Sequence, residues 1–320
     1  MLKHWLCHVN AKLTIRPNGP FLVKSGRATV HGPDAAPVTT YRSGEEVLFI
    51  PGSSLKGVIR SHVERIARSI HLDSVCEPYL ERAEAAADGN DRRIGCSHRL
   101  EAARRGGAAI DSVTAYRTAC AACRLFGSLR FIGRIRISDA YPKAGEAKPV
   151  AELRDNVAID RFTGGAASGK KFDQVVVQGG AFETEISIDN FELWQLAALD
   201  LVLADFADGI LAIGSGTSRG LGAVKAEVDS LKLSYLRPQE RIAGIGQLCE
   251  PATRNAYALS EWRPGSQPDL PAGERRGIRY VVDVTGQWRA QLDPLVPGLE
   301  AFLQERGTVE GQRAHARAGA

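Results

Sequence analysis

Four cysteines and a histidine are spaced so that four of the five side chains could hold one metal ion. Cys120 and Cys123 are separated by two residues, the gap that lets both thiolates reach the same tetrahedral ion. Cys96 and His98 stand upstream and could complete the set, and Cys76 is a competing fourth ligand. We therefore predict a zinc site of Cys96, His98, Cys120 and Cys123, with Cys76 as the alternative to His98. Because four protein ligands leave no open position, the zinc would be structural.

Disulfides are the other common use of cysteine, and the sequence disfavours them. The first fifteen residues alternate in type without the apolar core of a signal peptide, and no run approaches the roughly 18 apolar residues of a membrane span. We therefore expect a cytoplasmic protein without membrane association, whose thiols stay reduced. Cys7 and Cys249 are isolated and are expected to bind no metal.

The charge pattern favours an anionic partner. The net charge of +4 is too small to indicate a nucleic acid by itself. Between Arg92 and Arg136, however, there are ten arginines and only two acids, Glu101 and Asp111. A solvated surface usually mixes the two signs, so we expect this segment to meet an anion. The alternative is a soluble insertion whose arginines are incidental.

Two glycine-containing segments could lie against phosphates. The first, IPGSSLKG at residues 50–57, should begin a helix capped by Ser53 or Ser54, with Lys56 one turn in. The second, GSGTSRGLG at residues 214–222, has four glycines that permit close backbone approach, and Arg219 could donate two hydrogen bonds. A well-capped helix and a mobile connector are the alternatives.

The periodicity of apolar residues predicts the order strand, helix, strand, strand, helix, strand. The strands are expected at residues 4–16, 131–137, 182–188 and 223–233, and the helices at residues 53–70 and 191–207. This order is the ferredoxin-like or RNA-recognition-like βαββαβ core, an α+β fold. Its sheet has one face covered by two helices and one face free.

Two insertions and an extension complete the predicted organisation. The core domain is expected to span residues 1–235, with a zinc-binding insertion at 72–129 and a second insertion at 142–179. Residues 236–320 are expected to form a C-terminal extension in which one strand-like run, residues 278–284, stands alone. The last dozen residues have no apolar pattern, so we expect them to be disordered.

Three motifs, in order along the chain, resemble the RAMP superfamily of CRISPR RNA-binding proteins. Residues 50–57 and 214–222 are similar to its segment at the first helix and to its late glycine-rich loop. RDNVAIDRFTG at residues 154–164 resembles the stretch that begins the thumb hairpin in the backbone subunits repeated along type III effectors. Related subunits carry zinc before a segment like RLFG at residues 124–127. The resemblance covers roughly residues 3–235.

The resemblance implies a guide-RNA-binding subunit of a type III effector in antiviral defence. Copies of the subunit would stack on one another, beside other effector subunits, and each thumb would insert into the duplex of guide and target RNA. The implied RNA contacts are Ser53, Ser54, Lys56 and Arg60 near the guide backbone, Arg161, Phe162, Lys170, Lys171 and Phe172 in the thumb, and Gly216 and Arg219 in the glycine-rich loop.

The resemblance also implies a catalytic residue for cleaving target RNA. In the family an aspartate between the first strand and the first helix promotes attack by a ribose 2′-oxygen, and GPDAAPV at residues 32–38 is similar to that loop. Asp34 is the only acid before Gly44, and His31 could assist proton transfer. Such an endoribonuclease would use Mg²⁺ or Mn²⁺. The two alanines after Asp34 depart from the family, and an ordinary turn is the alternative.

Two other functions stay open. The chain could be a filament subunit that binds RNA without cutting it. It could also be a repeat-processing endoribonuclease of the same superfamily. Those enzymes usually place a histidine near the start of the first helix or in the glycine-rich loop, and residues 214–222 contain none. The zinc insertion and the thumb motif also disfavour this third function.

Overall fold

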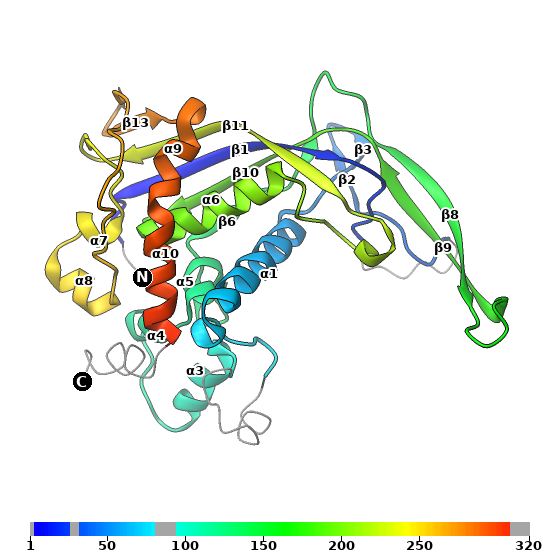
Figure 1. Ribbon diagram of the computed structural model, residues 1–320, viewed down its shortest axis with the longest axis horizontal. Helices are drawn as coiled ribbons and strands as arrows, with labels where there is room; N and C mark the ends of the chain where they lie inside the picture. The colour runs from blue at the N-terminus through cyan, green and yellow to red at the C-terminus, as the bar shows by residue number, and fades with distance from the viewer. Residues whose placement is uncertain (1–2, 26–31, 81–93, 308–320) are drawn as a thin grey trace.

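An antiparallel sheet with helices on one face forms the body of the protein (Figure 1). The computed structural model describes residues 3–25, 32–80 and 94–307. The main sheet has the strand order β12-β13-β11-β1-β10-β6, and β7 also pairs with β10. The strands are β1 Cys7–Pro17, β6 Ile135–Ile137, β7 Tyr141–Pro142, β10 Phe182–Asp189, β11 Val224–Tyr235, β12 Glu274–Arg276 and β13 Arg279–Asp283. The prediction of helices and an antiparallel sheet in one mixed fold is confirmed.

The central position of β1 follows from its alternating sequence. Cys7, Val9, Ala11, Leu13 and Ile15 are all buried. Since successive side chains of a strand point to opposite faces, these five residues face the helices and the polar residues between them face away. β1 pairs with β10 along one edge and with β11 along the other. The core of the protein is therefore built on both sides of the first strand.

Two helices cover the apolar face of the sheet, and a third packs on them. The first two are α1, Gly52–Ile70, and α6, Leu193–Ala207, and the third is α10, Val296–Gly307. α6 is apolar on nearly every side because it lies between the sheet and α10, which crosses it (Figure 1). The rings of Trp194 and Phe302 stack at this crossing, with their centroids 4.3 Å apart. None of the described helices is long and apolar enough to span a membrane.

The strand predicted at residues 131–137 is broken in two. β5, Phe131–Ile132, pairs with β4, Gly127–Ser128, in a separate hairpin, and only β6 joins the main sheet. Gly133 causes the break, because a Cβ there would lie 2.3 Å from the carbonyl carbon of Phe126. The chain crosses itself at this point, and Arg134 turns inward to donate to the Tyr116 hydroxyl at 2.8 Å.

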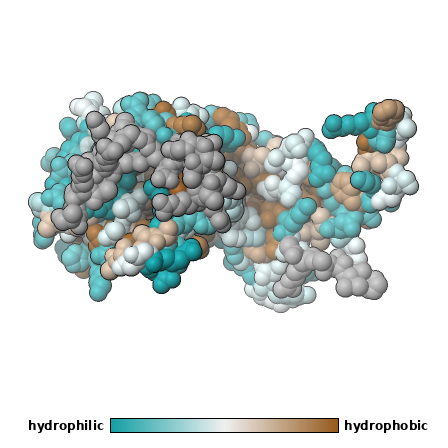
Figure 2. All heavy atoms as spheres, turned by 90° about the horizontal axis from the view of Figure 1, so that it is seen from below, coloured by the Kyte–Doolittle hydropathy of each residue, from teal (hydrophilic) through white to brown (hydrophobic). Residues whose placement is uncertain are grey.

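The two insertions differ in kind. The first contains a 3-10 helix, Leu72–Ser74, and the helices α3 Cys96–Arg105, α4 Ser112–Thr118 and α5 Ala121–Phe126. The second forms a long hairpin of β8, Val150–Ile159, and β9, Ala166–Gln178. This hairpin projects beyond the sheet, and Figure 2 shows it standing clear of the body. A short hairpin of β2, Thr39–Arg42, and β3, Glu45–Leu48, precedes α1.

The C-terminal residues complete the sheet. The strand predicted at residues 278–284 was expected to stand alone, and this was wrong: β13 pairs with β11, and β12 pairs with β13. A local pattern identifies a strand but not its partner. Helices α7 Ile245–Leu248, α8 Pro251–Tyr257 and α9 Trp288–Leu292 lie in the same segment. The disorder predicted for the tail concerns residues outside those described.

A buried carboxyl group of α6 lies beside an exposed carboxyl group of this segment. Asp200 of α6 is 2% exposed and lies beside Asp293. Burial, and then repulsion by Asp293, raise the pKa of Asp200 to about 8, while Arg289 opposes the shift. In the folded protein Asp200 therefore keeps its proton to about pH 8, whereas the unfolded chain loses it near its usual pKa of about 4. Stability should fall as the pH rises from about 4 to about 8.

We expect the Asp200→Asn variant to relieve this cost. Its free energy of unfolding should exceed that of the wild type by at least about 1 kcal/mol at pH 8, and by much less at pH 4.5. Urea denaturation at the two pH values measures the difference. Asp208→Asn, at the exposed end of the same helix, is the matched control and should show no such pH dependence. An equal gain for Asp200→Asn at both pH values would contradict the shifted pKa.

Candidate metal centre and nucleic-acid interface

Four cysteine sulfurs converge in the first insertion. The Sγ atoms of Cys76, Cys96, Cys120 and Cys123 all lie within 4.8 Å of one another, and all four residues are buried. Cys76 follows the 3-10 helix, Cys96 begins α3, and Cys120 and Cys123 belong to the first turn of α5. Segments separated by tens of residues thus bring their thiols to one point.

His98 does not belong to this group, and Cys76 takes its place. The physical reason is the start of α3 at Cys96. Side chains two positions apart on a helix point to different sides of it, so those of Cys96 and His98 cannot face one ion together. The all-cysteine alternative is the one that the geometry favours.

The sulfur spacing fits a tetrahedral metal ion. Cys76 Sγ lies 3.6 Å from Cys120 Sγ and 3.8 Å from Cys123 Sγ. A zinc ion with metal–sulfur bonds of about 2.3 Å has its four sulfurs about 3.8 Å apart. Four buried cysteines in this arrangement can hold a metal ion such as zinc.

The surroundings of the cluster suit anionic thiolates. The guanidinium of Arg60 donates to Cys123 Sγ at 3.4 Å, and that of Arg99 donates to Cys96 Sγ at 3.2 Å. The Nε atom of Arg99 is buried with no hydrogen-bond partner among the described residues. Cations in such places need nearby negative charge. Four thiolates on a divalent ion carry a net charge of −2, which two guanidinium groups would balance.

Hydrogen bonds within the cluster shift the pKa values of its thiols in different directions. Those with the thiols of Cys120 and Cys123 hold the pKa of Cys96 well below its usual value, although burial opposes this. Those with Cys123, Cys76 and Cys96 raise the pKa of Cys120. The backbone N–H of Cys120 also donates to Cys96 Sγ at 3.3 Å. Metal-binding thiolates are commonly stabilised by such donors around the ligands.

Arg60 was predicted to contact RNA, but its donors are engaged inside the protein. Besides Cys123, it donates to Glu64 at 2.8 Å and to the carbonyl oxygen of Gly127 at 3.3 Å.

The arginine-rich segment at residues 92–136 also places some of its guanidinium groups inside the protein. Arg117, Arg124 and Arg134 are buried. Arg124 donates to carbonyl oxygens of the protein, and Arg134 donates to the Tyr116 hydroxyl and to the carbonyl oxygen of Asn190. These three guanidinium groups therefore lie inside the protein.

The start of α1 differs from the prediction. The helix begins at Gly52, and neither Ser53 nor Ser54 caps it. Instead the Asp139 carboxylate accepts from the Gly52 N–H at 2.7 Å, so an acid already lies at this helix end. The sequence offered no sign of Asp139, which lies 87 residues away. A Cβ at residue 52 would lie 2.4 Å from the carbonyl oxygen of Ile137, which explains the glycine.

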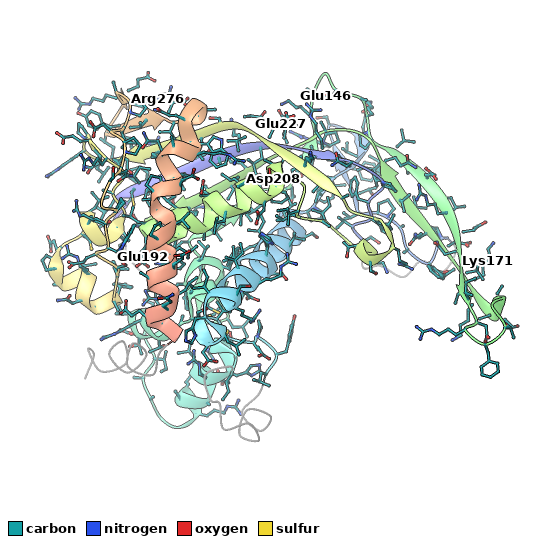
Figure 3. All side chains as sticks on the ribbon, in the orientation of Figure 1. Glu146, Lys171, Glu192, Asp208, Glu227 and Arg276 are labelled. Carbon is teal, nitrogen blue, oxygen red and sulfur yellow. The ribbon has the colours of Figure 1, made fainter. Side chains whose placement is uncertain are left out.

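The tip of the long hairpin exposes an aromatic ring on a firm turn. Asp160 Oδ1 accepts from the backbone N–H groups of Phe162 and Thr163, both at 2.8 Å. Phe162 is 101% exposed. Arg161 and Lys170 are also exposed, and Lys171 lies near the end of the hairpin in Figure 3, 3.5 Å from Asp155. The apolar ring of Phe162 is therefore exposed on a hairpin that also carries exposed cationic side chains.

Three distant parts of the chain meet on β9, about midway along the hairpin. Asp34 Oδ2 accepts from the backbone N–H of Asp173 at 3.0 Å, and Ala35 and Val175 are also joined by a backbone hydrogen bond. On the same strand, the ring of Phe172 lies under the guanidinium of Arg219, at 5.5 Å. Gly216, with φ +77°, starts the turn that carries Arg219. His31 lies outside the described residues.

The glycine-rich loop owes its shape to close backbone contacts. A Cβ at Gly214 or at Gly222 would lie 2.2 Å from a carbonyl oxygen, that of Leu22 or of Ile213 respectively. Ser215 N–H donates to the same Leu22 oxygen at 2.8 Å. These glycines therefore pack the loop against the protein and hold Arg219 beside the hairpin.

The free face of the sheet offers no platform for stacking bases. Proteins that read RNA on such a face use aromatic side chains. On β1, β10 and β6 the outward positions carry no Phe, Tyr or Trp, and Arg136 is paired with Asp189. The candidate RNA contacts lie in the loops and the hairpin instead.

Comparison with known families agrees with these features. The RAMP superfamily matches residues 20–225, which include the start of α1, the long hairpin and the glycine-rich loop. The chain belongs to the RAMP superfamily. Proteins of this superfamily are CRISPR-associated, bind CRISPR RNA and work in multisubunit complexes, and some are endoribonucleases. No curated protein sequence matches the chain.

Proposed function

We propose that the protein is a guide-RNA-binding backbone subunit of a type III CRISPR effector that cleaves complementary target RNA at regular intervals. The observation that carries this proposal is the meeting of Asp34, the hairpin and the glycine-rich loop. Asp34 bonds to β9 at Asp173, and Arg219 stacks on β9 at Phe172. The Asp34 loop, the hairpin and the glycine-rich loop lie far apart in sequence and come together around one strand.

The arrangement of the central strands supports an RNA-recognition-like core. Four strands in the order β11-β1-β10-β6, with α1 and α6 on one face, match the βαββαβ topology in both sequence order and pairing. We assign residues 1–235 to this core and its two insertions. Residues 236–320 remain a C-terminal extension in sequence, although β13 extends the same sheet.

The hairpin would act as the thumb. Phe162 can wedge between bases, since an apolar side chain at an exposed tip can unstack a duplex step. Arg161, Lys170 and Lys171 would meet phosphates. Phe172, Gly216 and Arg219 would contact RNA about midway along the thumb, and Ser53, Ser54 and Lys56 would do so near the guide backbone. Arg60 contributes through the metal centre described above.

The proposal also includes the metal ions that the protein would bind and the cellular compartment in which it would act. Zinc would be held by Cys76, Cys96, Cys120 and Cys123 and would keep the first insertion folded. Cleavage would use Mg²⁺ or Mn²⁺, and the protein would act in the cytoplasm with further copies of itself and other effector subunits.

In the proposed reaction a ribose 2′-oxygen of the target attacks the adjacent phosphorus. The bond from phosphorus to the 5′-oxygen breaks, leaving a 2′,3′-cyclic phosphate and a 5′-hydroxyl end. Asp34 would accept the proton of the 2′-hydroxyl. Its Oδ2 atom is held by the backbone of Asp173, which leaves Oδ1 without a bonded partner among the described residues.

We expect Asp34→Ala to abolish the ladder of cuts in target RNA, with at least about a hundredfold loss of rate. The assay uses the assembled effector, a complementary RNA and Mg²⁺. Target binding should be unchanged, because the carboxylate makes one hydrogen bond to the protein. Asp208→Ala, on an exposed helix end, is the control. Cutting at the wild-type rate by the Asp34 variant would remove Asp34 from the mechanism.

A non-catalytic filament subunit is the second candidate, and one contact favours it. The bond from Asp173 N–H to Asp34 could serve only to fasten the loop to the thumb. Intact target recovered from a fully assembled complex supplied with Mg²⁺ and Mn²⁺ would support this function over the first.

A further inference from the structure

Strand β8 forms the outer edge of the long hairpin (Figure 1). Among the described residues its one strand partner is β9. β8 has ten residues, whereas β12 and β6, at the two ends of the main sheet, have three each. β8 also contains no proline or lysine, the residues that often protect strand edges from pairing with another chain. It is therefore a long strand edge with little protection.

The hydrogen bonds of β9 show which backbone groups of β8 face outward. The N–H of Ala35 donates to the carbonyl oxygen of Asp173 at 3.2 Å, and the N–H of Val175 donates to that of Ala35 at 2.8 Å. Alternate residues of a strand point their backbone groups to opposite edges, so Gln174 bonds to its partner Arg154 in β8. The odd-numbered residues 151–157 of β8 consequently point their N–H and C=O groups away from β9.

The same odd-numbered residues expose apolar side chains. Leu153 is 61% exposed and Val157 is 46% exposed, on the face of the hairpin that no described segment covers. On the opposite face, Val176 of β9 is buried against Leu22 and Leu221. The uncovered face and the free edge of β8 together offer backbone donors, backbone acceptors and apolar area to a further strand.

The charges of β8 are complementary to those of a second β8 strand. Glu152 and Arg154 lie side by side, with 3.0 Å between Oε1 and Nε. If two β8 strands pair antiparallel with Leu153 opposite its counterpart, each Arg154 lies opposite the Glu152 of the other copy. The nearest registers that keep the same backbone hydrogen bonds place Arg154 opposite Arg154, or Glu152 opposite Glu152. Opposite charges across a strand pair are favourable and like charges are unfavourable, which selects the first register.

We propose that, in the absence of RNA, two copies of the protein pair through β8 about a two-fold axis at Leu153. The contact is reciprocal, because the same residues of both copies form it. It therefore differs from the stacking of copies along a guide RNA. In this register Ile159 lies opposite Ala147 of the second copy, so each hairpin tip lies against the loop that precedes the partner's β8. The pairing would keep both thumbs from RNA, and this consequence alone rests on the proposed function.

Sedimentation equilibrium of the metal-loaded full-length protein without RNA, at about 1 to 100 µM, measures the pairing. One strand pair is a small interface, so we expect a Kd on the order of 10 µM. Glu152→Arg and Arg154→Glu should each weaken the association about tenfold, since each places like charges opposite one another. An equal mixture of the two variants should recover it, because mixed pairs again have opposite charges. Glu240→Arg, at an exposed residue of the C-terminal extension, is the control of equal charge change.

Crosslinking locates the axis. The Cα atoms of a hydrogen-bonded antiparallel pair lie about 5.5 Å apart, so a short bis-maleimide should join two copies of Leu153→Cys. In Val157→Cys the two thiols would be about 26 Å apart along the strands, so few covalent dimers should form. The wild type controls for its own cysteines, five of which are buried.

Four results would each overturn the pairing. They are a monomer at every concentration, full association of both charge variants, no recovery on mixing, and equal crosslinking of Leu153→Cys and Val157→Cys. Thermal unfolding of the variants should resemble that of the wild type, because the changed side chains lie on the outside of the hairpin. If a charge variant does not fold, crosslinking of Leu153→Cys decides the question.

Adding single-stranded RNA of about 30 nucleotides separates this inference from the proposed function. We expect the RNA to dissociate the paired copies. If the wild type binds no RNA, the proposed function fails while the pairing, measured without RNA, stands. If RNA binds and leaves the pairs intact, the competition at the thumb is overturned. If RNA binds to a protein that is always monomeric, only the pairing fails.

Discussion

Replacing Glu192 by alanine is expected to lower the free energy of unfolding by about 3–5 kcal/mol. Glu192 is 0% exposed and stands at the start of α6 (Figure 3). One carboxylate oxygen accepts from the Tyr116 hydroxyl at 2.9 Å and lies 3.6 Å from Arg124 Nη1. The other accepts from the Ser260 N–H at 2.9 Å. Its removal would leave the fully buried guanidinium of Arg124 without its carboxylate.

The size of this effect follows from the surroundings. Arg124 and Arg134 both have their guanidinium groups over the Tyr116 ring, at 4.8 and 4.5 Å. Arg306 of α10 is also buried and donates to the carbonyl oxygens of Arg117 and Ala119. Several cations thus share one buried carboxylate, and breaking such an arrangement costs far more than breaking a surface ion pair.

Urea denaturation of the wild type and two variants measures the effect. Glu192→Gln keeps the acceptor oxygen and loses the charge, so its loss of stability should lie between those of the wild type and Glu192→Ala. Glu183→Ala, on the outer face of β10, should change stability by less than about 0.5 kcal/mol. If Glu192→Ala fails to fold, the Gln variant carries the test. A loss below about 1 kcal/mol in the Gln variant and in any folded Ala variant would contradict the role of Glu192.

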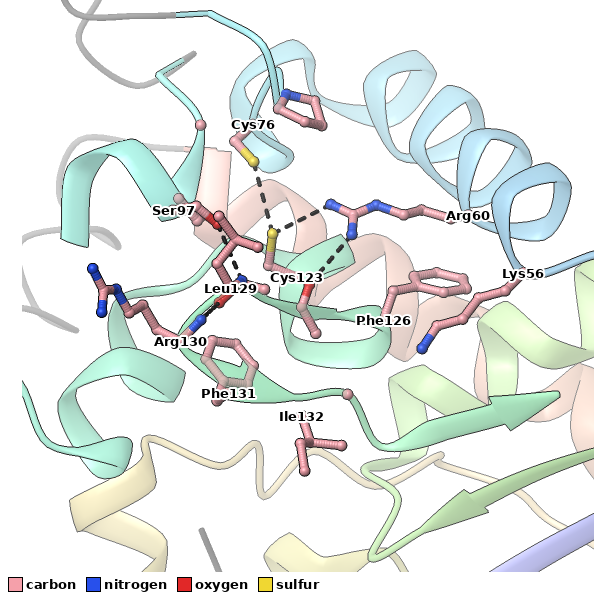
Figure 4. A pocket seen from close by; sticks show the side chains of 16 residues that line it. Lys56, Arg60, Cys76, Ser97, Cys123, Phe126, Leu129, Arg130, Phe131 and Ile132 are labelled. Carbon is pink, nitrogen blue, oxygen red and sulfur yellow. Dashed lines mark hydrogen bonds between the residues drawn. The ribbon is translucent and has the colours of Figure 1, made fainter. Parts of the chain in front are cut away.

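Removing one cysteine of the metal centre should have an effect of similar size. Cys120→Ser should lose the bound metal and destabilise the junction of α3, α5 and the segment at Cys76 (Figure 4), because the four cysteines join these segments. Structural zinc contributes about 10–16 kcal/mol of apparent binding energy in small domains at pH 7. Here a larger body holds these segments, so we expect a smaller but still cooperative loss. Elemental analysis and thermal unfolding with and without a chelator measure it.

Two variants test which side chains bind the metal. His98→Asn should keep the full metal content, whereas Cys76→Ser should lose it, since Cys76 lies in the cluster and His98 does not. Cys249→Ser, a cysteine outside the cluster, controls for the loss of a thiol. Loss of metal from the His98 variant with retention in the Cys76 variant would reverse the assignment.

Local patterns in the sequence predict the main elements well. The alternation in residues 4–16, 182–188 and 223–233 predicts strands, because one face of each strand is buried. The structure contains them at Cys7–Pro17, Phe182–Asp189 and Val224–Tyr235. The gap between Cys120 and Cys123 also predicts two neighbouring thiols, because a single turn of helix positions them. In each case the cause of the structure lies within about ten residues.

Features that depend on distant neighbours could not be predicted in this way. The choice between Cys76 and His98 depends on the residue at which α3 begins. The break at Gly133 depends on the backbone of Phe126 crossing close by. Two of the arginines predicted to meet an outside anion, Arg124 and Arg134, instead donate to carbonyl and hydroxyl groups that the fold supplies. Sequence shows the donors but not the acceptors.

The position of β1 has a consequence for how the chain is made. The first strand pairs with β10 and β11, so its nearest partner begins about 175 residues later, at Phe182. At about 5–20 residues per second, synthesis would leave β1 unpaired for roughly 10 to 35 seconds. During that interval an apolar strand has two open edges, which can pair with other chains. A nascent chain of this protein should therefore depend on chaperones until β11 has left the ribosome.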